Sequence, residues 1–269
     1  MTQNLKKLIA LDLDGTLLTR EKTISPRTKA MLREAVALGH HVVIATGRPA
    51  HASMMYYDEL ELTTPMVNYN GALTHHVKDP NWGEYHFPLE RNDALAIVAA
   101  CERFGADNMV AEIRDDYYMK SHDAEFIRTI CAGRAPLAIG EIPDLLTQNP
   151  TALLIKPNDA VVHELRAHLQ EYHAHMIEQR LWGAPWHVIE IVRSGVTKAT
   201  GLQRIAEHYG VRQADVIAFG DEDNDLEMIQ YAGHGVAMGN SNPLLKEVAN
   251  HITSTNDEDG IALMLEKLL

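Results

Sequence analysis

Cysteine and long apolar runs are scarce in this sequence of 269 residues. The only cysteines are Cys101 and Cys131, without a CxxC spacing, which argues against a disulfide framework. No stretch approaches the roughly 20 apolar residues that cross a membrane. The apolar run near the N-terminus is interrupted by Asp12 and is too short for a signal peptide. We therefore expect a cytoplasmic protein with no membrane partner.

Positive charge is also in short supply. The chain has 24 Lys and Arg against 37 Asp and Glu, a net charge of −13, which argues against nucleic acid as the main partner. An anionic small substrate would need local positive charge, so each Lys or Arg near a site matters. The 15 histidines lack the HExxH and Cys/His spacings of zinc sites, and we interpret them as surface or core residues.

The first and last thirds of the chain alternate predicted strands with predicted helices. Ser25–Leu38 has the pattern of a helix, with Ser25 as N-cap, Pro26 at the first position and Gly39 at the end. Apolar runs predict strands at 8–11, 41–45, 66–69, 216–219, 235–238 and 251–253, and helices at 50–60, 197–209, 226–232, 242–249 and 260–269. This alternation is typical of a doubly wound parallel sheet, the α/β class.

The middle of the chain breaks this rhythm. Helices are predicted at 93–104 and 160–173 and strands at 110–113, 117–119 and 153–155, with Pro and Gly residues between them. We expect residues 1–81 and 188–269 to form one domain, and residues 82–187 to form a second, α+β domain inserted into it.

The segment Asp12-Leu13-Asp14-Gly15-Thr16 follows the first predicted strand. Parallel α/β sheets carry their chemistry where such strands end. Two carboxylates about 4 Å apart repel by roughly 4 kcal/mol at an effective dielectric near 20, and a divalent cation would hold both ionised. The alternative is an acidic turn, because Asp-Gly is a common turn pair.

Three other segments accompany it at strand ends or on a helix beside them: Thr46-Gly47-Arg48, Lys198, and the acidic run Gly220–Asp225. Singly, each is compatible with an ordinary loop, an exposed lysine or a solvated turn. Together, in this order on a strand–helix alternation, they favour one composite site.

This set and order of motifs resembles the haloacid dehalogenase (HAD) superfamily, whose motifs read here as DLDGT, TGR, Lys198 and GDEDND. The element Tyr69-Asn70-Gly71-Ala72 and the large insertion are similar to the Cof-type branch, which carries an α/β cap. One departure is Ala199, where relatives usually have Gly after the lysine. The resemblance implies a HAD-like, Rossmann-like parallel core with an inserted cap that chooses the substrate.

The resemblance also implies roles for residues. Asp12 would be the nucleophile, and Asp14 would protonate the leaving group and then deprotonate the attacking water. Mg²⁺ would be held by Asp12, the backbone carbonyl of Asp14 and Asp221, with Asp225 as a further ligand or an anchor. Phosphoryl oxygens would be bound by Leu13, Thr46, Gly47, Lys198 and Asn224, and Arg48, Asn70 and Gly71 are further candidates for substrate contact.

The function that this implies is Mg²⁺-dependent hydrolysis of small phosphorylated metabolites, expected to be sugar phosphates, through an aspartyl phosphate. A phosphomutase or phosphotransferase with the same motifs is the alternative enzyme, and a phospho-acceptor receiver is the non-enzyme alternative. A P-loop is excluded because Gly195–Lys198 lacks the Gly before Lys. A monomer and a homodimer are both compatible with the sequence.

Overall fold

The computed structural model describes residues 6–181 and 188–269, which divide into two compact units. The core unit comprises the chain up to Arg48, Ser53–Tyr85 and Thr197–Leu269, and the inserted unit comprises Pro49–Ala52 and His86–Val196. The expected domain limits at 82 and 187 remain predictions, and residue 187 lies outside the described residues. The predicted α/β architecture, a parallel core sheet with an inserted region, is confirmed.

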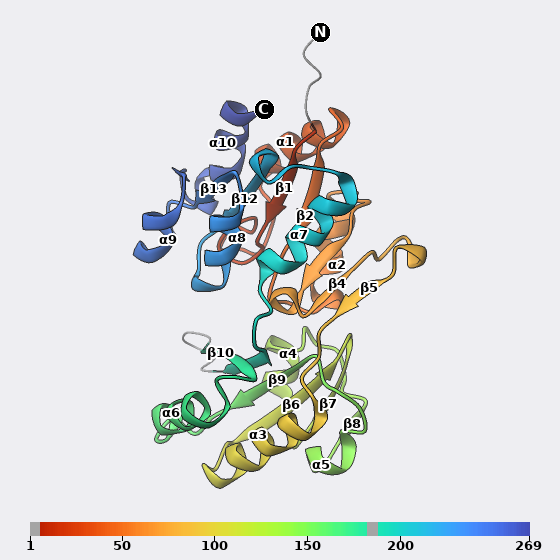
Figure 1. The fold of residues 1–269 in the computed structure, drawn as a ribbon, viewed down its shortest axis with the longest axis vertical. Coiled ribbons are helices and arrows are strands. Elements are labelled where there is room, and N and C mark those ends of the chain that lie inside the picture. Colours follow the sequence, from red (N-terminus) through yellow and green to blue (C-terminus); the bar gives the residue numbers. More distant parts are fainter. Residues whose placement is uncertain (1–5, 182–187) are drawn as a thin grey trace. The chain divides into compact units, whose positions relative to one another are not determined.

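The core unit is built on a five-stranded sheet in the order β14-β13-β12-β1-β2 (Figure 1). All neighbouring strands are parallel, and β1 is flanked by β12 and β2. Its strands are β1 (Leu8–Leu11), β2 (His41–Ile44), β12 (Val216–Gly220), β13 (His234–Ala237) and β14 (His251–Ile252). Because all strands run the same way, the segments that come after β1, β2 and β12 emerge at one edge of the sheet.

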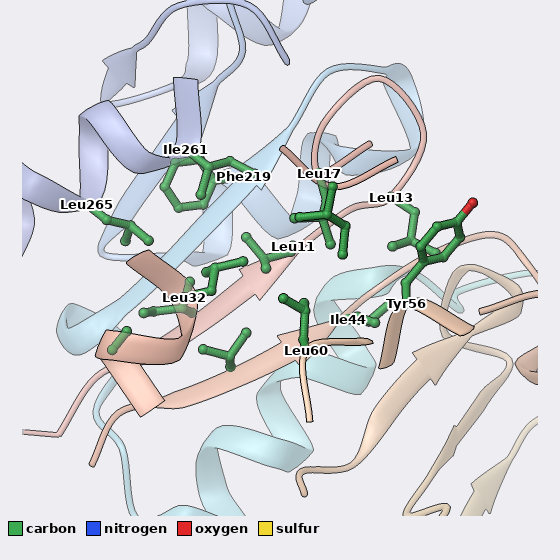
Figure 2. Packing of buried hydrophobic residues seen from close by; sticks show 14 of the residues in the cluster. Leu11, Leu13, Leu17, Leu32, Ile44, Tyr56, Leu60, Phe219, Ile261 and Leu265 are labelled. Atoms are coloured by element: carbon green, nitrogen blue, oxygen red, sulfur yellow. The ribbon is translucent and has the colours of Figure 1, made fainter. Parts of the chain in front are cut away.

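Helices cover both faces of this sheet, because alternate residues of each strand point to opposite sides. Ile9 and Leu11 of β1 pack in one apolar cluster with α1 (Pro26–Ala37), α2 (Ala50–Glu59) and α10 (Gly260–Leu268). Figure 2 shows Leu11 on this side with Leu32, Phe219, Ile261 and Leu265. Leu8 and Ala10 join the opposite cluster, with α7 (Lys198–Tyr209), α8 (Leu226–Tyr231) and α9 (Pro243–Val248). The sheet is thus doubly wound, as predicted.

Helix α1 illustrates how local sequence sets these elements. Ser25 accepts a hydrogen bond from the Thr28 amide at 3.2 Å, and Pro26 occupies the first helical position. The chain leaves the helix at Gly39, whose φ of 89° lies in the left-handed region. The predicted helix limits therefore differ from the observed ones by a single residue at each end.

A small three-stranded sheet, in which β3 and β4 pair in antiparallel fashion, comes after α2 in the order β3-β4-β5. Its strands are β3 (Met66–Asn68), β4 (Leu73–His75) and β5 (Glu84–His86), of which only β3 was predicted. A parallel bridge between Ala45 and Val67 ties β3 to the end of β2. The turn between β3 and β4, residues Tyr69–Gly71, is a 3₁₀ turn whose backbone bonds to the loop after β2.

The inserted unit has a six-stranded mixed sheet in the order β10-β11-β9-β6-β7-β8. One face packs against α3 (Arg91–Arg103), α5 (Ile142–Leu145) and α6 (Val162–His173), and α4 (Ala124–Thr129) packs on the other. The strands are β6 (Asn108–Ile113), β7 (Asp116–Met119), β8 (Ala138–Ile139), β9 (Ala152–Lys156), β10 (Ile177–Leu181) and β11 (Ile189–Arg193). None of the described helices combines the length and apolarity needed to cross a membrane.

Candidate active site

Asp12 and Asp221 are neighbours because the strands that precede them pair in the sheet. Leu11 of β1 lies opposite Phe219 of β12, and the Asp12 amide donates to the Phe219 carbonyl at 3.2 Å. Both aspartates are buried, with 5% and 6% of their surfaces exposed. Two carboxylates that are far apart in the sequence therefore meet at the carboxyl edge of the sheet, as predicted.

Lys198 is the cation of this buried cluster. Its Nζ donates to Asp12 Oδ1 at 2.6 Å and to Asp225 Oδ1 at 2.7 Å, and its side chain is fully buried. The lysine is the first residue of α7, which comes after the inserted unit. A buried ammonium is stable only when it is paired, and here two carboxylates pair it. Although burial alone would lower the pKa of Lys198, Asp12 and Asp225 raise it above its usual range.

Asp225 holds the loop that carries Asp221. Its Oδ2 accepts from the backbone amides of Asp221 and Glu222, at 2.9 and 3.1 Å, and the residue is fully buried. The side chain of Asp225 can lie this close to the backbone only because residue 220 is a glycine, since an added Cβ would lie 2.4 Å from the Cβ of Asp225. With one carboxylate oxygen on Lys198 and the other on two amides, Asp225 is arranged as an anchor of the cluster.

Thr16 and Gly15 orient Asp221 from the first motif. Thr16 Oγ1 donates to Asp221 Oδ1 at 2.8 Å. Gly15 has a φ of 80°, and an added Cβ would lie 2.1 Å from Asp221 Oδ2. The Gly-Thr pair is thus needed for the close approach of the two acidic loops. Neither residue was assigned a role from the sequence, although the Asp-Gly-Thr pattern itself was the signal that could have indicated one.

The cluster has the composition of a site for a hard cation. Oxygen atoms of Asp12, Asp221 and Asp225 lie within 4.8 Å of one another, and Lys198 neutralises a single negative charge. Burial, opposed by Lys198 but reinforced by Asp225, raises the pKa of Asp12 to about 7, and burial with Asp12 raises that of Asp221 to about 8. Carboxylate oxygens are ligands of Mg²⁺, so the residues present fit this ion, and Asp12 and Asp221 are the best-placed ligands.

Asp14 lies outside this cluster and is held by two cations. Arg48 donates from Nε to Oδ2 and from Nη2 to Oδ1, both at 2.6 Å, and Lys22 Nζ lies 2.6 Å from Oδ1. Although burial would raise its pKa, Arg48 and then Lys22 lower the pKa of Asp14 to about 2. The carboxylate is therefore ionised in this arrangement. Metal binding through its backbone carbonyl stays a prediction, and the role of Lys22 was not foreseen.

The Thr46–Arg48 loop comes after β2 at the same edge. Thr46 is buried, its amide donates to the Val67 carbonyl, and its Oγ1 accepts from the Arg48 amide at 3.1 Å. Leu13, between the two aspartates, turns its side chain into the core, which leaves its backbone as the part that could bind phosphate. Phosphate binding by Leu13, Thr46 and Gly47 stays a prediction.

The side chains of Asn70 and Asn224 meet behind these loops, and Gly71 follows Asn70 in the same turn. Asn224 Nδ2 donates to Asn70 Oδ1 at 2.9 Å. Asn70 and Gly71 are buried in the turn between β3 and β4, and Asn224 is half-buried. The residues predicted from the sequence are thus brought together in the core unit, although Asp14 and Arg48 pair with each other beside the buried cluster.

Comparison with known proteins gives consistent similarities along the whole chain. A sequence profile of haloacid dehalogenase-like hydrolases matches residues 9–265. The 5-amino-6-(5-phospho-D-ribitylamino)uracil phosphatase YitU of Bacillus subtilis is 46% identical over 260 residues, which cover 97% of this chain and 96% of the relative. A second B. subtilis phosphatase with the same named substrate, YcsE, is 31% identical over 95% of this chain and 93% of its own length.

A solved structure shares the fold over the same extent. A haloacid dehalogenase-like hydrolase from Bacteroides thetaiotaomicron superposes with a TM-score of 0.85 and 27% sequence identity. The match covers 98% of this chain and 100% of that one. Core sheet, inserted region and chain length are therefore shared.

Proposed function

Because the chain belongs to the haloacid dehalogenase-like hydrolases, in their Cof-type branch, and is a phosphatase, a hydrolase of phosphoric monoesters, we propose that it works through Asp12 with Mg²⁺. The substrate class is a phosphorylated small metabolite. The observation that carries the proposal is the buried cluster of Asp12, Asp221 and Asp225 around Lys198.

Asp12 would attack the phosphorus atom in line with the ester oxygen. The carboxylate oxygen forms a bond to phosphorus, the P–O ester bond breaks, and an aspartyl phosphate results. Lys198, bound to Oδ1 of Asp12 at 2.6 Å, fixes the orientation of the carboxylate and favours its ionised form against the effect of burial. A magnesium ion, when bound, would offset the negative charge of the phosphoryl oxygens and of the aspartates.

Asp14 would carry the proton between the two half-reactions. It would donate a proton to the leaving alkoxide and later take one from the water that attacks the aspartyl phosphate. With Arg48 and Lys22 lowering its pKa to about 2, Asp14 is ionised here and suited to accept a proton. To act as the donor, Asp14 would first have to leave these ion pairs and take up a proton from solvent, which it would then pass to the leaving oxygen.

The transferred phosphoryl group would be bound by donors from several loops. These are the Thr46 hydroxyl, the Gly47 and Leu13 amides, the Lys198 ammonium and the Asn224 amide. Donors that are fixed before the reaction stabilise the charge of the transition state without a reorganisation cost. Thr46 and Lys198 are each 1% exposed, so the protein itself holds them in place.

The relatives indicate a more specific substrate. YitU and YcsE are named for 5-amino-6-(5-phospho-D-ribitylamino)uracil, in which the phosphate is on the chain of a sugar alcohol. We propose the same compound as the first candidate for this chain, supported by 46% identity to YitU over nearly its full length. This candidate replaces the expected sugar phosphate with a phosphate ester on a sugar-alcohol chain.

The test is phosphate release with Mg²⁺ from an aryl phosphate, from 5-amino-6-(5-phospho-D-ribitylamino)uracil and from a panel of sugar phosphates. We expect the highest kcat/KM for the ribitylaminouracil ester and no turnover by Asp12→Asn. Full activity of Asp12→Asn would contradict the nucleophile. Phosphorus NMR of the products separates hydrolysis from a mutase, which would return an isomeric ester instead of free phosphate.

A further inference from the structure

The turn Tyr69–Gly71 has an unusual backbone. Its residues have φ values of 51°, 52° and 103°, so three consecutive residues lie in the left-handed region. For a residue with a side chain this conformation costs roughly 1–2 kcal/mol, and Asn tolerates it better than most residues. All three residues are buried. Such strain persists only where surrounding contacts determine it, and the contacts of this turn are informative.

The first contacts are with the loop after β2. The Asn70 amide donates to the Thr46 carbonyl at 3.1 Å, and the Tyr69 amide donates to the Arg48 carbonyl at 3.4 Å. An added Cβ on Gly47 would lie 3.1 Å from Asn70 Nδ2. The turn therefore packs directly behind the backbone that is proposed to bind phosphate.

The remaining contacts are with the loops that carry Asn224 and Lys198. Asn70 Oδ1 accepts from Asn224 Nδ2 at 2.9 Å. Gly71 lies against the residue before Lys198, because an added Cβ would come 2.1 Å from the Thr197 carbonyl oxygen. A single turn thus contacts three loops that belong to different parts of the core unit.

We propose that Asn70 is a positioning residue for phosphoryl transfer that acts through Asn224. The proposal rests on the proposed function of the site. By accepting from Asn224 Nδ2, Asn70 fixes the plane of that amide, so its second N–H keeps one direction. By its own backbone bond to Thr46, it fixes the distance between Asn224 and the Thr46-Gly47 loop. Asn70 is fully buried with its side-chain oxygen bonded to Asn224, so this role through Asn224 differs from the direct substrate contact suggested by the sequence.

A double-mutant cycle tests the coupling. Asn70→Gly removes the side chain but keeps a residue that adopts the left-handed conformation freely. We expect it to lower kcat/KM for a phosphate ester about tenfold in the wild-type background and to weaken competitive inhibition by inorganic phosphate in parallel. An effect of this size is within the usual range of interaction energies between contacting residues. In an Asn224→Ala background, the same substitution should change kcat/KM less than about twofold.

Additive effects of the two substitutions, or an Asn70→Gly enzyme that matches the wild type in kcat/KM and in phosphate inhibition, would overturn the proposal. Thermal unfolding establishes that each variant is folded. Asn70→Ser, which also removes the long acceptor but fills more of the buried space, provides the same cycle if Asn70→Gly does not fold. A wild-type protein that releases no phosphate would instead contradict the proposed function.

Discussion

Asp12 and Asp14 are separated by one residue, yet the structure gives them opposite surroundings. Asp12 belongs to a buried cluster of three carboxylates in which Lys198 pairs with Asp12 and Asp225. Asp14 belongs to an ion-pair group in which one carboxylate is shared by Arg48 and Lys22, with 43% of its side chain exposed. Burial with an excess of carboxylates raises the pKa of Asp12 to about 7, whereas the two cations outweigh burial and lower that of Asp14 to about 2.

The difference shows that the pKa of a carboxylate depends on its exposure and on the number of cations relative to carboxylates around it. The residue type is the same in both cases. A buried ion pair that loses one partner leaves an uncompensated charge, which costs about 3–5 kcal/mol. An exposed pair contributes only about 0–1 kcal/mol, since water and salt screen it. The cluster around Lys198 and the ion pairs of Asp14 should therefore respond very differently to substitution.

The largest effect is expected for Lys198→Met. Removing the ammonium leaves Asp12 and Asp225 buried without their cation, so unfolding free energy should fall by about 3–5 kcal/mol. Loss of a fixed donor to the transition state should lower kcat by about a hundredfold to a thousandfold. Urea unfolding and steady-state kinetics measure the two effects. A stable and active Lys198→Met variant would show that the cluster does not depend on this cation.

Removal of the metal should rank next. Chelation should abolish phosphate release, and Mg²⁺ at about 100 times its Kd should stabilise the wild type by about 2.7 kcal/mol. Asp221→Asn removes one of the two best-placed ligands and should lose most of the rise in Tm on adding Mg²⁺. Glu222→Gln, an exposed change next to it, is the matched control and should keep that rise. An unchanged Mg²⁺ response in Asp221→Asn would place the ion elsewhere.

The pH dependence of the metal-free protein should be smaller but specific in sign. Asp12 and Asp221 have ordinary pKa values of 3.8 that folding raises to about 7 and 8, so the folded state binds more protons. Their contribution to stability is full below pH 4 and decreases as the pH rises through 7 to 8. Chemical unfolding from pH 4 to 9 with chelator measures this trend, and Mg²⁺ should reduce it. A rise in unfolding free energy from pH 4 to 9 would contradict the expectation that ionisation of Asp12 and Asp221 destabilises the metal-free protein.

The smallest effect is expected for Lys22→Met. Its side chain is 57% exposed in its pair with Asp14, so unfolding free energy should change by less than about 1 kcal/mol. The pKa of Asp14 should rise, and more so in Arg48→Met, because Arg48 makes two hydrogen bonds to this carboxylate. Carbon-13 NMR titration of the Asp14 carboxyl measures the shift. The stabilisation given by these cations should be present above pH 4 and disappear as the pH falls through 2.

Much of the site was predictable because strand order and chain direction are encoded locally. Asp12, Thr46 and Asp221 each come directly after an apolar run, and the carboxyl ends of parallel strands lie at one edge of the sheet. Lys198 was predicted from motif order, which reflects the same topology. The helix limits of α1 are set by Ser25, Pro26 and Gly39, whose conformational preferences are local.

The features that the sequence did not predict depend on contacts between distant segments. The bond from Thr16 to Asp221 joins residues 205 positions apart, and Lys22 meets Asp14 only because the intervening turn adopts its own conformation, with a φ of 59° at Lys22. Strands β4, β5 and β8 have two or three residues each, too few to show a periodic pattern. The left-handed backbone at Asn70 likewise depends on contacts with Thr46 and Asn224, and not only on the conformational propensity of Asn.

The position of β1 between β2 and β12 has a consequence for how the protein is made. One side of β1 pairs with β2, which the ribosome supplies about thirty residues later, but the other side pairs with β12, which begins at Val216. Lys198 and Asp221 also come late in translation. A nascent chain therefore carries Asp12, the proposed nucleophile, for most of its synthesis without Lys198, the acidic loop of Asp221 or the strands β12, β13 and β14. If these residues form the proposed site, we expect phosphatase activity to begin only when the last third of the protein has emerged and inserted beside the first.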